Sequence, residues 1–282
     1  MESSRARSST IGAMEPVPPP EIVFEDVYKS FDHAALQAVS LTISRGEMVA
    51  IVGWAGSGKT VLLKMITGHF RPDRGRVFVA DHESPGSPLR DLAALTERDM
   101  DRLRAHWALV FQGNALLGGT VYENLTVFPR ETRQKPETEL LPLARKVLVD
   151  SGLEPEAVLE RDCHSLSVGM AKLVAIARAL MLDPVLVMYD SPTAGLDPEM
   201  AWRIDKLIAT THARMPALGV VRTTLVATHD TELLRHLRPR IVMLQEGRIS
   251  FDGSFEAFAA SNDPQVRPYL QQTGLLNIRD SD

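Results

Sequence analysis

Gly53-Trp54-Ala55-Gly56-Ser57-Gly58-Lys59-Thr60 is the stretch that decides the fold, and it fits the pattern G-x-x-x-x-G-K-[ST]. Glycines in such a loop let the backbone turn its N–H groups inward without clashes of Cβ atoms. Residues 47–52 predict a buried strand before the loop, and residues 59–68 predict a helix whose positive end points at the same anion. A chance glycine-rich turn is the alternative. We expect the loop to hold the phosphates of a nucleotide.

Two side chains of the loop and one carboxylate further along the chain form a candidate ATP and Mg²⁺ site. Lys59 is expected to reach the β- and γ-phosphates, and Thr60 to ligate Mg²⁺. Residues 186–190 predict a buried strand that delivers Asp190 at its carboxyl end, where a second acid for the Mg²⁺ shell is needed. An apolar run that ends in aspartate is often structural, but its place after a phosphate loop favours a metal-ligating role.

Composition and charge restrict the class of protein. The chain has 282 residues, with 31 Lys and Arg against 36 Asp and Glu and a net charge of −5. No run of basic residues forms a stripe, so nucleic acid is not expected as a partner. Cys163 is the single cysteine, which excludes an intrachain disulfide framework and suits a reducing compartment. Cys163 and His164 alone provide too few ligands for a structural metal site.

The chain does not predict a membrane-spanning helix of its own. No apolar stretch reaches the ~18 residues that span a bilayer, because Arg178 and Asp183 interrupt the best candidate at 173–188. The protein is therefore expected to be soluble, and a role at a membrane needs a partner that spans it. Residues 1–20 are rich in Ser, Arg and Pro, which predicts a disordered tail, with a transit peptide as the alternative.

Short apolar runs and helical stretches alternate from residue 21 onward, which favours an α/β fold with a mainly parallel sheet. Residues 112–166 are mostly helical in pattern, clearest at 137–151, and predict a helical subdomain. After a helix at 255–260 we expect the domain to end near residue 260, with a C-terminal tail over 261–282. Strands are predicted at 22–28, 39–43, 48–52, 76–80, 108–111, 185–189, 224–227 and 241–244.

Further along the chain, the candidate motif residues are Phe31, Gln112, residues 166–170, Asp197 and His229. Their order and spacing over residues 21 to about 260 resemble those of the ABC ATPases. The resemblance implies a P-loop NTPase of the ABC-ATPase type, in which an antiparallel β subdomain and a helical subdomain accompany the mainly parallel core. The matched residues are Phe31 (the aromatic that stacks on adenine), Gln112 (the Q-loop), Leu166 to Met170 (the LSGGQ-type signature), Asp197 (the D-loop) and His229 (the switch histidine).

The resemblance implies a role for three of these side chains. Gln112 is expected to contact Mg²⁺ and the attacking water, and His229 to lie near the γ-phosphate; strand capping and an ordinary loop histidine are the alternatives. Phe31 is expected to stack on adenine, although an aromatic residue near a strand end is also often part of a core. Trp54 within the phosphate loop is unusual, and the sequence offers no explanation for it.

In this family the signature of one chain covers the nucleotide of another. The resemblance therefore implies a homodimer that encloses two ATP molecules, in which Ser167 and the backbone amide of Gly169 reach the γ-phosphate across the interface. Val168 replaces the usual glycine and Met170 the usual glutamine. The added Cβ atom of Val168 is expected to loosen the contact across the interface.

Ser191 is the sharpest departure from the family pattern. It follows Asp190 at the position where the family carries a glutamate that polarises the attacking water. A serine hydroxyl cannot act as a carboxylate base near neutral pH, and a positioned base contributes about 10²–10⁴-fold to the rate. We therefore predict ATP binding with slow hydrolysis, supported by His229 and by positioning. The alternative is that another acid, such as Asp197 of either chain, takes over.

Three parts of the sequence resemble the ATPases of Mla-type, MCE-associated phospholipid transporters. They are Met170, residues 111–117 and residues 262–270. The resemblance implies a subunit that couples ATP-driven dimer closure to a membrane permease docked on residues 112–166, with an MCE-type lipid-binding protein as a further partner. It also implies a cytoplasmic location, peripheral on the inner face of the cell membrane.

Two other classes of protein are weighed against this one. An ATP-binding switch with little or no hydrolysis is favoured by Ser191 alone. A soluble ABC protein of DNA maintenance or translation would need long heptad repeats or two cassettes in one chain, and the sequence contains neither.

Overall fold

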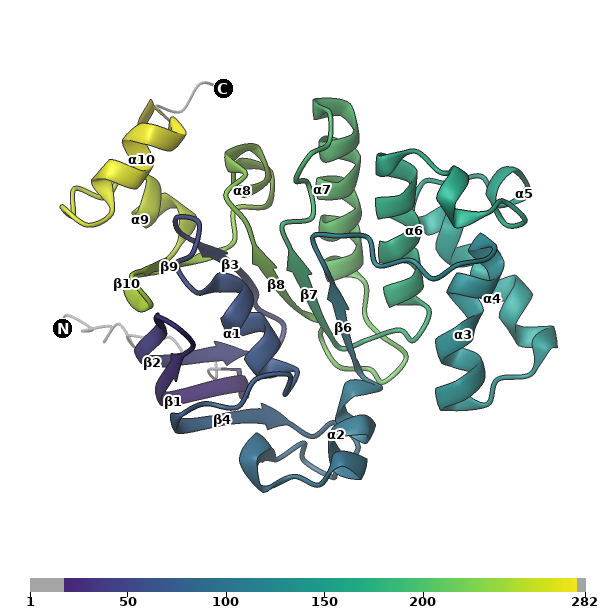
Figure 1. The fold of residues 1–282 in the computed structure, drawn as a ribbon, viewed down its shortest axis with the longest axis horizontal. Helices are drawn as coiled ribbons and strands as arrows, with labels where there is room; N and C mark the ends of the chain where they lie inside the picture. Colours follow the sequence, from purple (N-terminus) through teal and green to yellow (C-terminus); the bar gives the residue numbers. More distant parts are fainter. Residues whose placement is uncertain (1–17, 278–282) are drawn as a thin grey trace, which may run out of the picture.

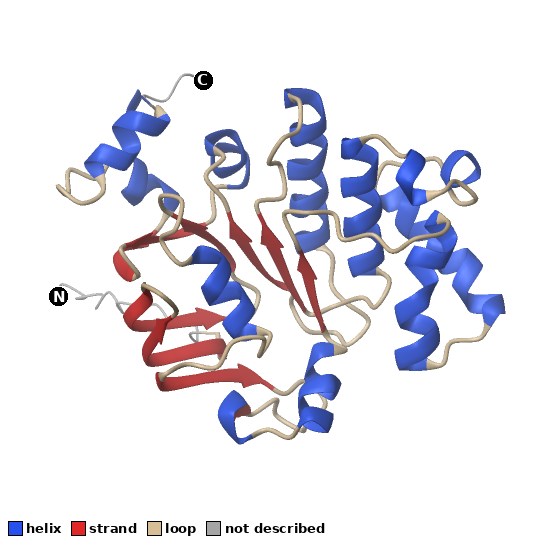
Figure 2. Cartoon of the chain, in the orientation of Figure 1, coloured by secondary structure: helices blue, strands red, loops and turns tan. Residues whose placement is uncertain are grey.

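Two β-sheets form the centre of the structure, a computed structural model that describes residues 18–277 (Figures 1 and 2). Most of the predicted N-terminal tail lies outside the described residues, and the first strand begins at Pro20. The fold has the predicted α/β architecture, with one mainly parallel sheet, one antiparallel sheet and a separate group of helices.

The larger sheet has six strands in the order β10-β9-β3-β8-β7-β6. Strands β9, β3, β8, β7 and β6 run parallel, and β10 pairs antiparallel with β9 at the edge. The predicted strands of this sheet are confirmed, but β10 was not expected. The strands are β3 (Met48–Val52), β6 (Trp107–Val110), β7 (Leu186–Asp190), β8 (Thr223–Ala227), β9 (Arg240–Gln245) and β10 (Arg248–Gly253).

The smaller sheet is antiparallel, in the order β2-β1-β4-β5, and confirms the expected antiparallel β subdomain. In Figure 1 it lies below the left end of the large sheet, with α1 beside it. Its strands are β1 (Pro20–Ser30), β2 (Ala34–Ser44), β4 (Arg74–Ala80) and β5 (Leu89–Asp91).

Helices α3, α4 and α5 form the helical subdomain, which Figure 1 shows at the far end from the antiparallel sheet. Among residues 18–277, no helix combines the length and the hydropathy needed to cross a membrane. The helices are α1 (Lys59–Ile66), α2 (Glu97–Arg104), α3 (Val121–Arg133), α4 (Glu137–Asp150), α5 (Pro155–Val158), α6 (Val168–Leu180), α7 (Pro198–Ala213), α8 (Thr231–Leu237), α9 (Phe255–Ala259) and α10 (Arg267–Thr273).

Strand β3 shows how the large sheet is buried on both faces. Its side chains alternate: Ala50 and Val52 belong to one core cluster, and Val49 and Ile51 belong to the other. The first cluster includes residues of α6, α7 and α10, and the second includes residues of α1 and the antiparallel sheet. A continuous apolar run is what a parallel strand with both faces covered requires. The phosphate loop that follows β3 thus begins from a rigid strand.

The chain beyond residue 260, which we expected to be a tail, contains helix α10. Val266, Tyr269 and Leu270 lie at the i, i+3, i+4 spacing of an apolar helix face, and all three are buried in the core cluster that contains Ala50 and Val52 of β3. Leu275 is buried there as well. The folded domain therefore extends past residue 260, because this short segment carries enough apolar surface to pack on the core.

Candidate nucleotide-binding site

The phosphate loop connects β3 to α1, as predicted, and its glycines adopt positive φ angles. Gly53, Gly56 and Gly58 have φ values of 140°, 77° and 105°. A Cβ atom at Gly53 would lie 2.1 Å from the backbone oxygen of Leu244, and one at Gly58 would lie 2.5 Å from that of Ala35. The backbone conformation and the close packing on β9 and β2 both require glycine at these two positions.

Lys59 folds back over the loop. Its Nζ atom donates hydrogen bonds to the backbone oxygens of Gly53 (2.9 Å) and Trp54 (2.8 Å). Burial lowers the pKa of the Lys59 ammonium, and the nearby Asp190 carboxylate acts in the opposite direction. The cation is thus held within the loop, beside the amides that would bind a phosphate, and a bound anion would favour its charged form.

Thr60 and Asp190 lie together although 130 positions separate them in the chain. The Thr60 hydroxyl donates to Asp190 Oδ2 at 2.8 Å. Parallel pairing of β3 with β8, and of β8 with β7, brings the carboxyl ends of these strands to one edge of the sheet. Hydroxyl and carboxylate oxygens are the ligands that Mg²⁺ prefers, so this pair fits Mg²⁺, with water and phosphate oxygens completing the shell.

Ser191 and His229 line a common cavity of about 290 Å³ next to Asp190. The Ser191 backbone N–H donates to the Ala227 oxygen at 2.8 Å, and its hydroxyl lies 3.4 Å from Asp190 Oδ1. The structure therefore brings Ser191, the predicted position of the base, and His229 to one cavity. This is where the attacking water of an ATPase would need a base.

The acid that lines this cavity, Asp230, is already engaged. Its Oδ2 atom accepts a hydrogen bond from the Thr193 hydroxyl at 2.6 Å, and its Oδ1 atom caps α8 by accepting from the Glu232 amide at 3.0 Å. Asp197 does not line the cavity; it caps α7 by accepting from the Met200 amide at 2.9 Å. Within the described chain, neither acid is placed as a substitute for the missing glutamate.

Gln112 lies two residues after the end of β6, and its side chain is exposed. Its backbone oxygen accepts a hydrogen bond from the Lys172 ammonium at 2.6 Å, and the oxygen of Phe111 accepts another at 3.1 Å. Lys172 is almost fully buried, and burial lowers its pKa while Asp190 acts in the opposite direction. The sequence analysis did not identify Lys172. The signal that could have identified it is its position on the buried face of the helix that follows the signature.

Phe31 lies in the turn between β1 and β2 and is 53% exposed. Its ring meets Phe70 edge to face, with ring centroids 5.1 Å apart. The start of β2 packs closely on the phosphate loop, since a Cβ atom at Gly58 would lie 2.5 Å from the Ala35 oxygen. The expected contact of this exposed ring with adenine stays a prediction.

The signature residues lie at the start of α6. Ser167 caps this helix by accepting from the Met170 amide at 3.3 Å. Val168 is 65% exposed, and Gly169 packs so tightly on Met200 that a Cβ atom would lie 2.7 Å from that side chain. Figure 1 shows α7 and strands β7 and β8 between α6 and α1, so the signature does not join the phosphate loop of its own chain.

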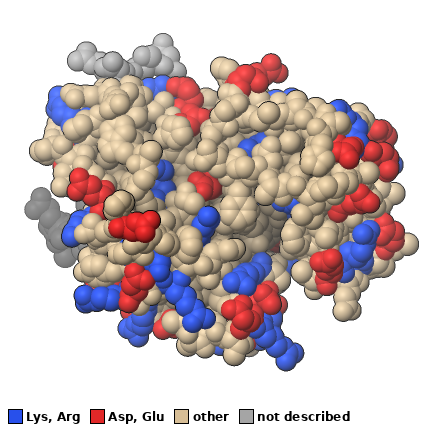
Figure 3. Space-filling view, viewed as in Figure 1, with Lys and Arg blue, Asp and Glu red and all other residues tan. Residues whose placement is uncertain are grey.

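The face of the molecule seen in Figure 3 mixes acidic and basic side chains, and no extended basic area covers it. The basic groups gather along the lower edge together with acidic ones. On this face the charge distribution does not resemble the basic stripe of a nucleic-acid-binding surface.

Comparison with known proteins agrees with this geometry. A protein-family model described as ABC transporter matches residues 36–194. The chain is 32% identical over 265 residues to the chloroplastic protein Trigalactosyldiacylglycerol 3 of Arabidopsis thaliana, covering 89% of this chain and 73% of that protein. It is 31% identical over 252 residues to the histidine transport ATP-binding protein HisP of Pseudomonas aeruginosa, covering 87% and 96%.

Two solved structures share the fold. One is cbiO1 of Clostridium perfringens, part of the ABC transporter complex cbiONQ, with a TM-score of 0.72, 27% identity and coverage of 92% of this chain and 100% of that one. The other is the ATP-binding cassette MJ0796, a dimer in a post-hydrolysis state bound to ADP and Pi, with a TM-score of 0.72, 26% identity and coverage of 83% and 98%. The chain belongs to the ABC transporter family and is an ATP-binding domain of the ABC ATPase type.

Proposed function

We propose that this chain is the ATP-binding subunit of a membrane transporter, in which ATP-driven closure of a homodimer drives a permease. The observation that carries the proposal is the pairing of Thr60 with Asp190 at the mouth of the phosphate loop. It brings together the two side chains expected to hold Mg²⁺ beside the phosphate loop, whereas Ser167 and Val168 stand exposed at the start of α6. A second copy of the chain would supply these signature residues to the nucleotide.

Phospholipid is the substrate that we propose, in a transporter of the Mla type with an MCE-type lipid-binding protein. The name of the Arabidopsis relative refers to a galactolipid. Met170 in the signature and the segment that contains α10 support the same subfamily. The protein would then work on the inner face of the cell membrane, bound to the permease from the cytoplasmic side.

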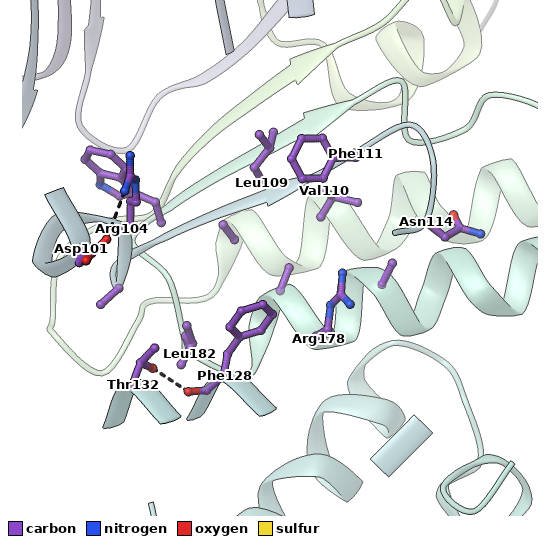
Figure 4. A pocket seen from close by; sticks show the side chains of 15 residues that line it. Asp101, Arg104, Leu109, Val110, Phe111, Asn114, Phe128, Thr132, Arg178 and Leu182 are labelled. Atoms are coloured by element: carbon purple, nitrogen blue, oxygen red, sulfur yellow. Dashed lines mark hydrogen bonds and ion pairs between the residues drawn. The ribbon is translucent and has the colours of Figure 1, made fainter. Parts of the chain in front are cut away.

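A groove between the parallel sheet and the helical subdomain is the surface that we propose for the permease. It has a volume of about 460 Å³ and lies among β6, α2, α3 and α6 (Figure 4). Leu109, Phe111 and Phe128 line it, and Phe128 is 43% exposed. Phe111 and Asn114, which flank Gln112 in the chain, line the groove, so a helix of the permease seated here would lie next to the expected Q-loop. Such a contact would link the permease to the Mg²⁺ site.

Replacing Phe128 with aspartate is expected to reduce the amount of permease that co-purifies with the chain by at least about fivefold, because a charge would be buried in an apolar contact. The measurement is co-purification of the tagged chain with an ABC-type permease from detergent-solubilised native membranes. Leu141→Asp, at an apolar residue of α4 that is 40% exposed and lies outside the groove, is the matched control. Equal recovery of permease with Phe128→Asp and with the unchanged chain would contradict the docking surface.

An ATP-binding switch is the second candidate function, and Ser191 is the observation that favours it. If closure is driven by ATP binding alone, the site resets by exchange of nucleotide rather than by hydrolysis. Phosphate release from the complex of chain and permease separates the two candidates, since only the transport ATPase releases phosphate in step with turnover.

A further inference from the structure

Trp54 and helix α10 are two features that the nucleotide site leaves unexplained, and they contact each other. Trp54 is the second residue of the phosphate loop and is 36% exposed. Tyr269 on α10 is 1% exposed. The two rings meet edge to face, with centroids 5.1 Å apart and planes at 64°. This is a favoured geometry for an aromatic pair, so the C-terminal helix supports the loop directly.

Tyr269 is a fixed partner in this contact. Its ring lies 6.1 Å from that of Phe258 on α9, which lies 5.1 Å from that of Phe251 on β10. Burial raises the pKa of Tyr269 to about 12, and the backbone of Gly53 acts in the opposite direction. A row of packed rings therefore runs from the edge strand of the large sheet to the phosphate loop.

The loop needs such support because its glycines leave it conformationally free. Gly53 packs closely on β9, and Lys59 begins α1, so both ends of the loop are fixed. Between them, a Cβ atom at Gly56 would meet nothing within 4 Å. Trp54 is the large side chain of this open stretch. Packing it on the core reduces the number of loop conformations that compete with the one that binds phosphate.

We propose that α10 is an accessory part of the nucleotide site, in which Tyr269 holds Trp54 and thereby keeps the phosphate loop in its binding conformation. This inference rests on the proposed binding of ATP and adds a pair of positioning residues to it. A second consequence follows from thermodynamic linkage: bound nucleotide stabilises the seating of α10, and displacement of α10 weakens nucleotide binding.

The test is a double-mutant cycle on nucleotide affinity. Trp54→Leu, Tyr269→Leu and the double variant of the full chain are titrated with a fluorescent, non-hydrolysable ATP analogue in the presence of Mg²⁺. Each single variant is expected to raise the Kd by about two- to tenfold, the range that an aromatic pair contributes. The double variant is expected to be no weaker than the worse single variant, because both changes remove one interaction.

Matched variants separate a positioning role from a merely structural one. Tyr269→Phe keeps the ring pair and should bind as the unchanged chain does. Trp202→Leu, at an exposed tryptophan of α7, should also leave the Kd unchanged. If Tyr269→Leu protein fails to fold, Trp54→Leu still tests the positioning role, because the Trp54 side chain is partly exposed. Folded Trp54→Leu protein with an unchanged Kd, or additive effects in the double variant, would overturn the inference.

Hydrogen exchange provides an independent readout of the same coupling. The analogue is expected to slow amide exchange in residues 267–273 of the unchanged chain and to have no such effect in Trp54→Leu protein at saturating concentration. Equal protection of α10 in both proteins would argue against the coupling. Failure of the unchanged chain to bind the analogue at all would instead refute the proposed function, which keeps the two failures distinguishable.

Discussion

Replacing Ser191 with glutamate is expected to raise the steady-state ATPase rate of the chain with its permease by about 10²–10⁴-fold, the usual contribution of a positioned base. Ser191 lies between Asp190 and the cavity that contains His229, which is the place where the attacking water must be polarised. The adjoining cavity of about 290 Å³ leaves room for the longer side chain. A carboxylate there would accept the proton of the water, which a serine hydroxyl cannot do near neutral pH.

Ser191→Gln is the matched control for this prediction, since glutamine has the size of glutamate without its basicity. Its rate is expected to remain close to that of the unchanged chain. Phosphate release measured on all three complexes checks the prediction. A native rate as high as that of Ser191→Glu would show that another group already serves as the base.

Lys59→Ala is expected to raise the Kd for ATP by about 10- to 150-fold, the range for loss of a hydrogen bond to a charged group. The Lys59 ammonium lies within the loop, 2.9 Å from the Gly53 oxygen, and no other side chain of the loop carries a positive charge. Isothermal titration with the non-hydrolysable analogue and Mg²⁺ measures the effect.

The control for Lys59→Ala is Lys64→Ala, which removes the same charge from the same helix. Lys64 lies in the last turn of α1, with its ammonium 5.7 Å from the centre of the Phe70 ring. Its removal is expected to change the Kd by less than about twofold, because its ammonium lies over the Phe70 ring and not within the phosphate loop. Similar losses in both variants would mean that net charge, not the position of Lys59, determines affinity.

The phosphate loop and the Mg²⁺ pair could be predicted from sequence because each depends on local signals. The loop pattern specifies its own backbone, and the apolar strand that ends at Asp190 specifies where that carboxylate emerges. Parallel pairing then brings Asp190 to Thr60, as the 2.8 Å hydrogen bond shows. The fold class, a mainly parallel sheet, was therefore enough to predict that Thr60 and Asp190 lie close together.

Other features depend on long-range packing that the sequence does not display. Strand β10 was missed because its pattern is short and partly exposed, and it forms only by pairing with β9 after the turn at Glu246 and Gly247. Lys172 looks like a surface residue until its ammonium is seen to meet the oxygens of Phe111 and Gln112. Helix α10 has one buried turn, and its role becomes visible only through the contact between Tyr269 and Trp54.

This chain is expected to bind ATP and to close as a dimer but to hydrolyse slowly, because Ser191 occupies the position of the base. The most direct test is a single-turnover experiment, in which an excess of the unchanged chain, in complex with its permease, is mixed with radiolabelled ATP and Mg²⁺. The bound nucleotide is then identified over time. We expect a dimer that retains intact ATP for minutes or longer. Conversion of the bound ATP to ADP within about a second, the pace of an ordinary enzyme, would contradict slow hydrolysis.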